Sequence, residues 1–357
     1  MRILQLNFER GWRGGERQTL LCLRQFRAAG HQAALLARRG EPLARMAREE
    51  GFEVHEAANP VSLCLKLARL ARGFDILHAQ TANTLTWLAL LKPLLRRPIV
   101  FTRRTAFPVS KEKQDRTRWK WQRADLLVAI SEAAAAEPRR LDLPAMVIPS
   151  AIAARPFDLN HARAFAERHD LHGRKVIATV AALTREKDPC TLVRAVHALR
   201  QTREDFVFLH LGAGGDAEQA ARDLAGQLGA QDYYLFAGFQ QRVEDLYRVM
   251  DVFVLASIHE ALGTSVLDAF LYSVPVVSTN AGGLAELLAD GRGLLCEVGD
   301  HLALAQGMAR VLDEADLRSG MVRKAHAFVL EQHDPRRMAH RYLDAYRAVM
   351  TRFHARG

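Results

Sequence analysis

The chain has 357 residues, of which 49% are hydrophobic and 25% are charged. This composition excludes an intrinsically disordered chain, and the length predicts two domains, because one hydrophobic core rarely serves so many residues. The formal net charge is +10. Residues 1–150 hold 26 Lys and Arg against 14 Asp and Glu, a net charge of +12, and the remaining residues carry −2. The excess positive charge therefore lies in the first half.

The first half predicts an open parallel α/β domain, because short apolar stretches alternate with longer helical ones. Strands are expected at 2–8, 32–38, 52–57, 75–80, 98–104, 125–131 and 145–150, and helices at 15–30, 42–50, 61–72, 84–95 and 111–123. The most apolar helix, 84–95, is interrupted by Lys92 and Pro93 and is too short to span a membrane. The first residues suit a strand and not a signal peptide.

The alternation restarts at residue 175, with strands expected at 175–183, 206–212, 233–238, 251–257 and 275–280. Residues between these halves contain no strand pattern, which places the domain boundary near residue 155. A terminal amphipathic helix, 334–353, is expected to pack back on the first domain. We therefore predict an N-terminal Rossmann-like domain at 1–155, a C-terminal one at 156–334 and a returning helix at 335–357, with the two domains facing each other across a cleft.

The cysteines carry no metal or disulfide pattern. They lie far apart in apolar stretches, at Cys22, Cys64, Cys190 and Cys296. This spacing predicts a reduced cytoplasmic compartment and no structural zinc.

Two acidic residues flank a tight turn after the strand at 251–257. Glu260 precedes Leu262, Gly263, Thr264 and Ser265, and Asp268 follows them. A helix beginning at this turn would offer free backbone amides to a phosphate, whereas ionised carboxylates accept hydrogen bonds from hydroxyls. The pattern favours a ligand with central phosphates and outer hydroxyls, such as a nucleotide-diphosphate sugar. As an alternative, Ser265 and Asp268 form a capping box at the helix start.

Other groups are expected at the same sheet edges. Arg185 and Lys187 follow the strand at 175–183 and would neutralise a diphosphate, although a solvated basic loop is the alternative. Gly214 lies in a glycine-rich turn after the strand at 206–212. Gly14 and Gly15 open the first helix, in a spacing that is not the dinucleotide-binding fingerprint, so an NAD enzyme is disfavoured.

These motifs resemble those of a known family. The chain is similar to retaining glycosyltransferases of family 4, with the GT-B fold, in the stretches "LTREKDP", "LGAGG", "FAGF" and "HEALGTSVLDAF…PVVSTNAGG". The resemblance implies that Glu260 contacts the donor sugar, that Asp268 contacts the ribose, and that the amides between them hold the phosphates. It also implies retention of anomeric configuration.

Three positions depart from the family pattern. Asp268 replaces a glutamate, and Ala182 stands where relatives carry an arginine. Arg103 or Arg104 takes the place of a histidine, which makes both candidate acceptor ligands. His78 is then the nearest histidine at a strand end, either in the site or as a buried structural residue.

The resemblance implies no cofactor other than the donor substrate, and the sequence contains no Asp-x-Asp pair for a divalent metal. We expect Lys187, Arg185 and the turn amides to stabilise the departing diphosphate instead.

The basic segment from Arg96 to Arg123, which includes Trp119 and Trp121, suits an anionic glycolipid acceptor and the inner face of a membrane. A solvated helix with its tryptophans in the core is the alternative. Nucleic acid is not expected, because no reading motif accompanies the charge. Two other functions stay open: a sugar-nucleotide epimerase or hydrolase on the same fold, and a non-catalytic glycolipid-binding relative.

Overall fold

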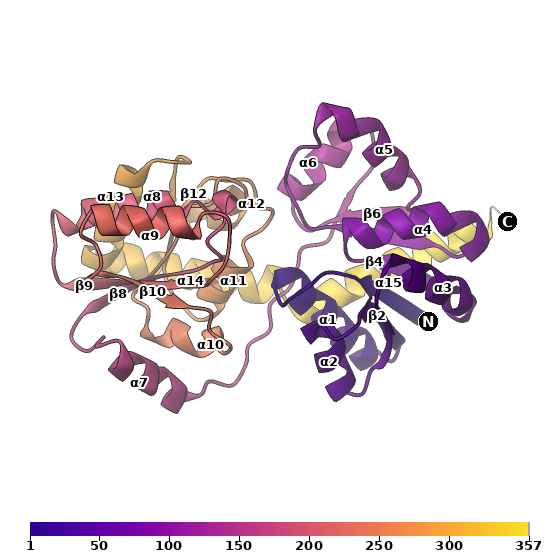
Figure 1. Ribbon diagram of the computed structural model, residues 1–357, viewed down its shortest axis with the longest axis horizontal. Coiled ribbons are helices and arrows are strands. Elements are labelled where there is room, and N and C mark those ends of the chain that lie inside the picture. Colours follow the sequence, from indigo (N-terminus) through magenta and orange to yellow (C-terminus); the bar gives the residue numbers. More distant parts are fainter. Residues whose placement is uncertain (356–357) are drawn as a thin grey trace. The chain divides into compact units, whose positions relative to one another are not determined.

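The computed structural model describes residues 1–355, which form two compact units (Figure 1). Unit 1 comprises Met1–Ala151 and the chain from Gln332 onward, and unit 2 comprises Ile152–Glu331. The units therefore divide at residues 151 and 331, a few residues before the predicted boundaries at 155 and 334.

Unit 1 is built on a 7-stranded sheet of order β3-β2-β1-β4-β5-β6-β7, in which every neighbouring pair is parallel. The strands are β1 (Arg2–Asn7), β2 (Gln32–Arg38), β3 (Glu53–Ala57), β4 (Ile76–Ala79), β5 (Ile99–Arg103), β6 (Leu126–Ala129) and β7 (Met146–Val147). The order reverses between β1 and β4, so the loops after these two strands flank the position where open parallel sheets bind ligands.

The helices of unit 1 cover this sheet. They are α1 (Gly14–Ala28), α2 (Pro42–Glu49), α3 (Pro60–Leu70), α4 (Ala82–Leu95), α5 (Gln114–Gln122), α6 (Glu132–Arg140) and α15 (Pro335–His354), with short 3-10 turns η1 (Ala71–Gly73) and η2 (Lys111–Lys113). Sequence analysis did not predict α6. Its alanine stretch has no periodic apolar pattern and it contains Pro138, yet Ser131 caps its first turn by accepting a hydrogen bond from the Ala134 amide.

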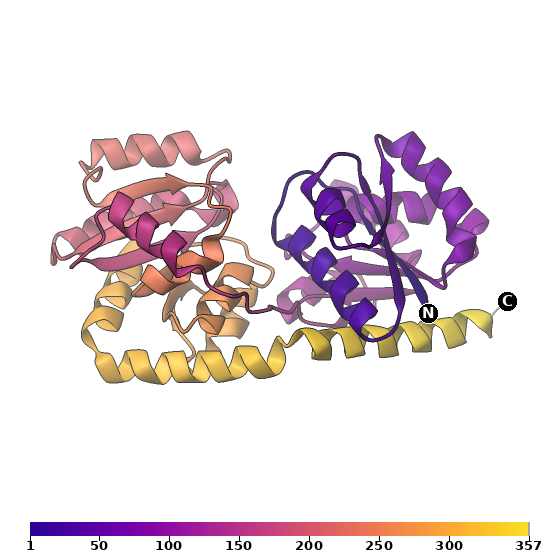
Figure 2. The ribbon, with the colours of Figure 1, turned by 90° about the horizontal axis from the view of Figure 1, so that it is seen from below.

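The C-terminal helix α15 belongs to unit 1 and lies beside α1 (Figure 2). Its apolar side is buried, as the amphipathic pattern of the sequence predicts, through Met338, Tyr342, Ala345, Tyr346 and Val349. The ring of Phe26 on α1 meets that of Tyr346 edge to face, with 5.7 Å between centroids. Aromatic packing therefore fixes the last helix to the first domain's core.

Unit 2 is built on a 6-stranded sheet of order β10-β9-β8-β11-β12-β13, again parallel throughout. The strands are β8 (Lys175–Val180), β9 (Phe206–Leu211), β10 (Tyr234–Gly238), β11 (Val252–Leu255), β12 (Val276–Thr279) and β13 (Leu294–Cys296). The strand order reverses between β8 and β11, which makes the loops after them the expected ligand-binding loops.

Helices and 3-10 turns connect these strands. They are α7 (Leu159–Arg168), α8 (Pro189–Arg200), α9 (Glu218–Gln227), α10 (Val243–Leu246), α11 (Thr264–Leu271), α12 (Gly283–Leu288), α13 (His301–Asp313), α14 (Ala315–Gln332), η3 (Arg185–Lys187), η4 (Tyr247–Val249) and η5 (Ala289–Gly291). The predicted strand-free segment after unit 1 contains α7, which His161 ties to Asp245 of α10 at 3.0 Å.

Both units are thus doubly wound parallel α/β domains, and the predicted fold class is confirmed. Over residues 1–355, no helix combines the length and the apolar character needed to cross a membrane.

Candidate functional site

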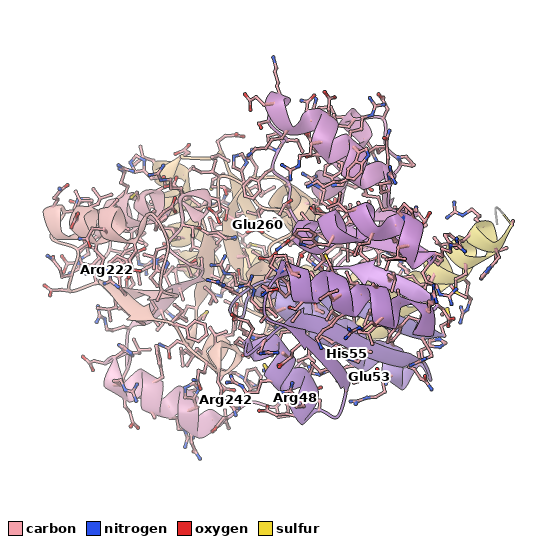
Figure 3. The ribbon with its side chains drawn as sticks, turned by 45° about the vertical axis from the view of Figure 1, so that its right-hand side comes forward. Arg48, Glu53, His55, Arg222, Arg242 and Glu260 are labelled. Carbon is pink, nitrogen blue, oxygen red and sulfur yellow. The ribbon has the colours of Figure 1, made fainter. Side chains whose placement is uncertain are left out.

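Lys187 and Glu260 meet at the point where the unit 2 sheet reverses its order. Lys187 ends η3, which follows β8, and Glu260 follows the neighbouring strand β11. The Lys187 Nζ donates to Glu260 Oε2 in an ion pair whose side chains are 25% and 14% exposed (Glu260 is labelled in Figure 3). The Ile258 amide donates to the Glu186 carbonyl at 2.8 Å, which ties the two loops together. The folded chain therefore places a cation and a carboxylate side by side at this sheet edge.

The turn after Glu260 presents free backbone donors. The helix α11 begins at Thr264, and its N-cap is Gly263 with a φ of 92°. A Cβ on Gly263 would lie 2.7 Å from a methyl carbon of Leu284, so both the conformation and the space favour glycine there. Within residues 1–355, the amides of Thr264 and Ser265 donate no hydrogen bond. An anion can be held at such a helix start.

Asp268 does not form the capping box that was left open as an alternative. Because Gly263 and not Ser265 is the N-cap, Asp268 lies in the second turn of α11, where it is 2% exposed. That alternative is wrong. Leu262 is also buried, at 3% exposure. Because its side chain is apolar, only its backbone groups could contact a phosphate.

Arg185 lies apart from the ion pair. Its side chain is 82% exposed, and its Nε contacts Asp216 Oδ2 at 3.2 Å, while its amide donates to the same carboxylate at 2.9 Å. The amide of Gly214 donates to Glu218 at 2.8 Å. Arg185 and the Gly214 amide are therefore each bound to a nearby carboxylate, Asp216 and Glu218 respectively, and the sequence analysis predicted neither contact.

Glycines allow the two loops beside Lys187 to approach closely. A Cβ on Gly212 would lie 1.8 Å from the Ala181 carbonyl oxygen, and one on Gly215 would lie 2.2 Å from that of Leu183. Two buried hydroxyl oxygens, those of Thr184 and Ser257, have no hydrogen-bond partner in the described part of the chain. Thr184 precedes Lys187 by three residues and Ser257 precedes Glu260 by three residues, so each of the two loops contains one of these buried hydroxyls.

A second polar group lies at the corresponding edge of unit 1. Gly14 and Gly15 open α1 after β1, and their amides donate no hydrogen bond within the described residues. The carboxylate of Glu16, in the same turn, accepts from the Arg13 amide at 3.0 Å and from Asn7 at 3.2 Å. Burial raises the pKa of the Glu16 carboxyl above its ordinary value, and the hydrogen bonds from Asn7 and the Arg13 amide oppose that shift.

Arg104 is the arginine that reaches this edge. Its guanidinium donates to Gln80 Oε1 at 2.5 Å and to Ser150 Oγ at 3.1 Å, and the Cβ position of Gly15 lies 3.9 Å from its Cδ. Its Nε is buried without a partner among residues 1–355. A cation therefore lies beside the free amides that open α1.

Arg103 is not an acceptor ligand in this structure. It is 3% exposed, and its guanidinium donates to the carbonyl oxygens of Ala134 at 2.6 Å and Phe107 at 2.5 Å. It also lies over the ring of Trp121, and burial lowers its pKa to about 10. Because successive residues of an extended strand point to opposite faces, Arg103 and the following Arg104 point in different directions. Arg103 contacts α6 through Ala134 and α5 through Trp121, inside the fold.

His78 is likewise placed in the core and not at the sheet edge. It is fully buried, with its Nδ1 2.6 Å from the Tyr346 hydroxyl and its Nε2 2.7 Å from Thr102 Oγ1. Burial holds the pKa of His78 well below its usual range, so the imidazole is neutral. The returning helix α15 covers it, which supports the structural interpretation.

The basic segment divides its two tryptophans between core and surface. Trp121 is 6% exposed and packs in the core of unit 1, whereas Trp119 is 37% exposed, with Arg123 over its ring. The alternative that placed both tryptophans in the core is therefore confirmed for Trp121 and wrong for Trp119, and the membrane interpretation stays a prediction.

Sequence reasoning missed Gln80, Glu16 and Asp216. Gln80 follows β4 directly, so its position at a strand end was an available signal. Glu16 follows the glycine pair, as first-turn acids often do. No group of three or more His, Cys, Asp or Glu side chains suited to a metal occurs among residues 1–355.

Comparison with known proteins agrees with this geometry. Residues 12–155 match the family model "Glycosyltransferase Family 4", and residues 163–328 match "Glycosyl transferases group 1". The solved structure of Anabaena Alr3699/HepE, in complex with UDP and glucose, is similar with a TM-score of 0.84 and 19% identity, over 97% of this chain and 99% of that one. These findings place the chain among the group 1 glycosyltransferases of GT-B fold.

Two curated relatives come from Rhizobium meliloti (strain 1021). The chain is 28% identical over 169 residues to the lipopolysaccharide core biosynthesis glycosyltransferase LpsE, covering 47% of this chain and 48% of the relative. It is 27% identical over 282 residues to the lipopolysaccharide core biosynthesis mannosyltransferase LpsB, covering 73% and 77%. The chain spans about half the length, or less, of several other curated relatives that it matches.

Proposed function

We propose that the protein transfers a sugar from a nucleotide-diphosphate sugar to a hydroxyl of an anionic glycolipid or polysaccharide, in the synthesis of lipopolysaccharide or another cell-envelope glycan. The observation that supports this most directly is the meeting of Lys187 and Glu260 beside the free amides of Thr264 and Ser265. One cation, one carboxylate and a helix start match the diphosphate and the sugar hydroxyls of such a donor.

The chemistry assigns a distinct role to each group. The bond between the anomeric carbon and the phosphate oxygen breaks, and its electron pair stays on the diphosphate, where Lys187 and the α11 amides stabilise the growing charge. The acceptor oxygen bonds to the anomeric carbon on the same face, and its proton passes to the leaving phosphate. Glu260 orients the sugar, and Asp268 contacts the ribose. Configuration is retained, as the family resemblance implies.

A metal ion is not required in this scheme, because a lysine and backbone amides supply the positive charge that a divalent cation supplies in other transferases. Full activity in the presence of a chelator is the expected result. Loss of activity in the chelator, with recovery on adding Mg²⁺ or Mn²⁺, would overturn the metal-free part of the proposal.

The acceptor is assigned to unit 1. Arg104 and the amides of Gly14 and Gly15 form a cationic and donor-rich edge there, and the basic segment from Arg96 to Arg123 attracts an anionic substrate. The same charge favours peripheral association with the anionic inner face of a membrane. The names of LpsE and LpsB agree with an acceptor from a lipopolysaccharide core.

Turnover with candidate nucleotide sugars, with and without acceptor, tests the proposal. Acceptor-dependent release of nucleoside diphosphate is expected, and Glu260→Ala should abolish it without unfolding the protein, because Glu260 lies in a loop. Donor hydrolysis or epimerisation without acceptor would indicate the second candidate class, and donor binding without turnover would indicate a non-catalytic relative. Wild-type rates in Glu260→Ala would remove this residue from the site.

A further inference from the structure

The outer surface of α3 and α4 is both apolar and basic. Each helix exposes two large aliphatic side chains, Val61 (69%) and Leu65 (56%) on α3 and Leu90 (54%) and Leu94 (53%) on α4. In each helix the two are four residues apart and so lie on one side. We call the surface formed by these four residues and the cations around them the α3–α4 face.

The two apolar stripes point away from the sheet. Leu63 and Leu88 are fully buried in the core of unit 1. Because successive helical residues turn by about 100°, Leu65 and Leu90 lie roughly 200° from these core residues and face outward. The two helices contact each other (Figure 1). Arg97, just after α4, donates to the Arg72 carbonyl at 2.9 Å, which joins the ends of the two helices.

The charge of this face has one sign. Residues 60–73 and 82–97 contain no Asp or Glu. Their basic residues are Lys66, Arg69, Arg72, Lys92, Arg96 and Arg97. Lys92 pairs with Asp125, but the other five form no ion pair with a carboxylate in the described part of the chain. By contrast, α9 of unit 2 pairs Arg222 with its own Glu218.

We propose that the α3–α4 face docks on an anionic lipid bilayer, with the four aliphatic side chains inserted at the headgroup boundary and the cations on the lipid phosphates. Exposed aliphatic stripes flanked by unpaired cations are the pattern of interfacial membrane-binding helices. The inference extends the proposed function, because a glycolipid acceptor lies in such a surface.

A second copy of the chain is a poorer occupant of this face. A two-fold symmetric contact would place each patch against its own copy. Five cations would then oppose five cations with no acidic residue between them, which costs free energy. An anionic bilayer removes that repulsion and covers the aliphatic side chains in the same contact.

Co-sedimentation of the full chain with phosphatidylcholine vesicles, with and without phosphatidylglycerol, tests the proposal. Wild-type protein should bind only the vesicles that contain phosphatidylglycerol. Leu90→Ser with Leu94→Ser should weaken that binding about tenfold or more. Arg69→Gln with Arg72→Gln, which removes two exposed charges outside the segment assigned to the acceptor, should weaken it about 30-fold, from roughly 1 kcal/mol per basic side chain.

Matched controls come from unit 2. Leu302→Ser with Leu330→Ser changes two leucines that are 56% and 55% exposed, and Arg163→Gln with Arg168→Gln removes two exposed charges from α7. Both controls should bind vesicles as the wild type does. The proposal fails if the α3–α4 variants bind vesicles as tightly as the wild type does. It also fails if sedimentation velocity shows a concentration-dependent dimer that Leu90→Ser with Leu94→Ser dissociates and the control variants do not.

The outcome is separable from that of the proposed function. The α3–α4 variants should keep the wild-type turnover on acceptor dispersed in detergent, since none of the changed residues lies in the candidate site. Vesicle binding without any sugar transfer would leave the docking face intact and remove the transferase. Sugar transfer without vesicle binding would support the transferase and refute the docking face.

Discussion

Glutamine in place of Glu260 provides a sharp test of the site, because it removes a charge and keeps the shape. In the ligand-free protein the Glu260 carboxylate engages Lys187. A donor diphosphate must compete for that lysine. Glu260→Gln is therefore expected to strengthen the binding of free nucleoside diphosphate while it weakens sugar transfer, whereas Lys187→Met should weaken both.

The magnitude follows from the exposure of the pair. At an effective dielectric constant of about 20, two charges in contact attract by about 4 kcal/mol before desolvation, whereas fully exposed pairs contribute about 0.2 to 1 kcal/mol net. Side chains that are 14% and 25% exposed lie between these limits. We expect a net contribution of about 1 kcal/mol, which corresponds to roughly fivefold tighter binding of the diphosphate to Glu260→Gln.

Isothermal titration with UDP and with GDP measures the effect. The matched control is Lys175→Met, because Lys175 faces Asp251 across β8 and β11 at the opposite ends of the two strands, with 3.5 Å between Nζ and Oδ1. This variant should bind both nucleotides as the wild type does. The reasoning fails if Glu260→Gln weakens nucleotide binding as much as Lys187→Met, since the carboxylate would then be a nucleotide ligand and not a competitor.

Three further predictions concern stability and the acceptor. Gly212→Ala should destabilise unit 2 by about 2 to 4 kcal/mol in urea unfolding, because its Cβ would meet a backbone carbonyl oxygen, whereas Gly320→Ala, with open space around it, should not. Burial lowers the pKa of His210 to about 4 from 6.5, so the stability present above pH 6.5 should fall by about 3 kcal/mol as the pH drops to 4, and less steeply in His210→Gln. Gln80→Leu should raise the KM for an anionic acceptor about fivefold and leave the KM for the donor unchanged, because the Arg104 guanidinium loses the oxygen that positions it at the sheet edge. Equal changes in both KM values would argue against this assignment.

Local patterns were sufficient to predict every strand except β13, and the start of α11. The apolar stretches with short polar breaks correspond to the observed parallel strands, and the glycine before Thr264 marks the helix start. Residues near a strand end were correctly expected at the sheet edge when they lay in the following loop, as with Lys187 and Glu260. Local patterns were insufficient for α6, whose proline and alanines give no periodic signal.

Residue pairing depended on the tertiary structure. Arg103 and Arg104 are adjacent in the sequence, yet one braces the core beside Trp121 and the other reaches Gln80 at the edge. The alternation of a strand separates such neighbours, but only the packed helices show which face is buried. Similarly, His78 becomes a core residue because α15, more than 250 residues later, places Tyr346 against it.

The sequence by itself determined the two parallel α/β units and the chemistry available at their strand ends, because periodicity and turn residues act over a few positions. Only the tertiary structure decided which charged groups are partnered, since Glu260 finds Lys187, and Arg185 finds Asp216, across loops that are distant in the chain. Contact between side chains is a property of the whole packed sheet, and no short stretch of residues specifies it.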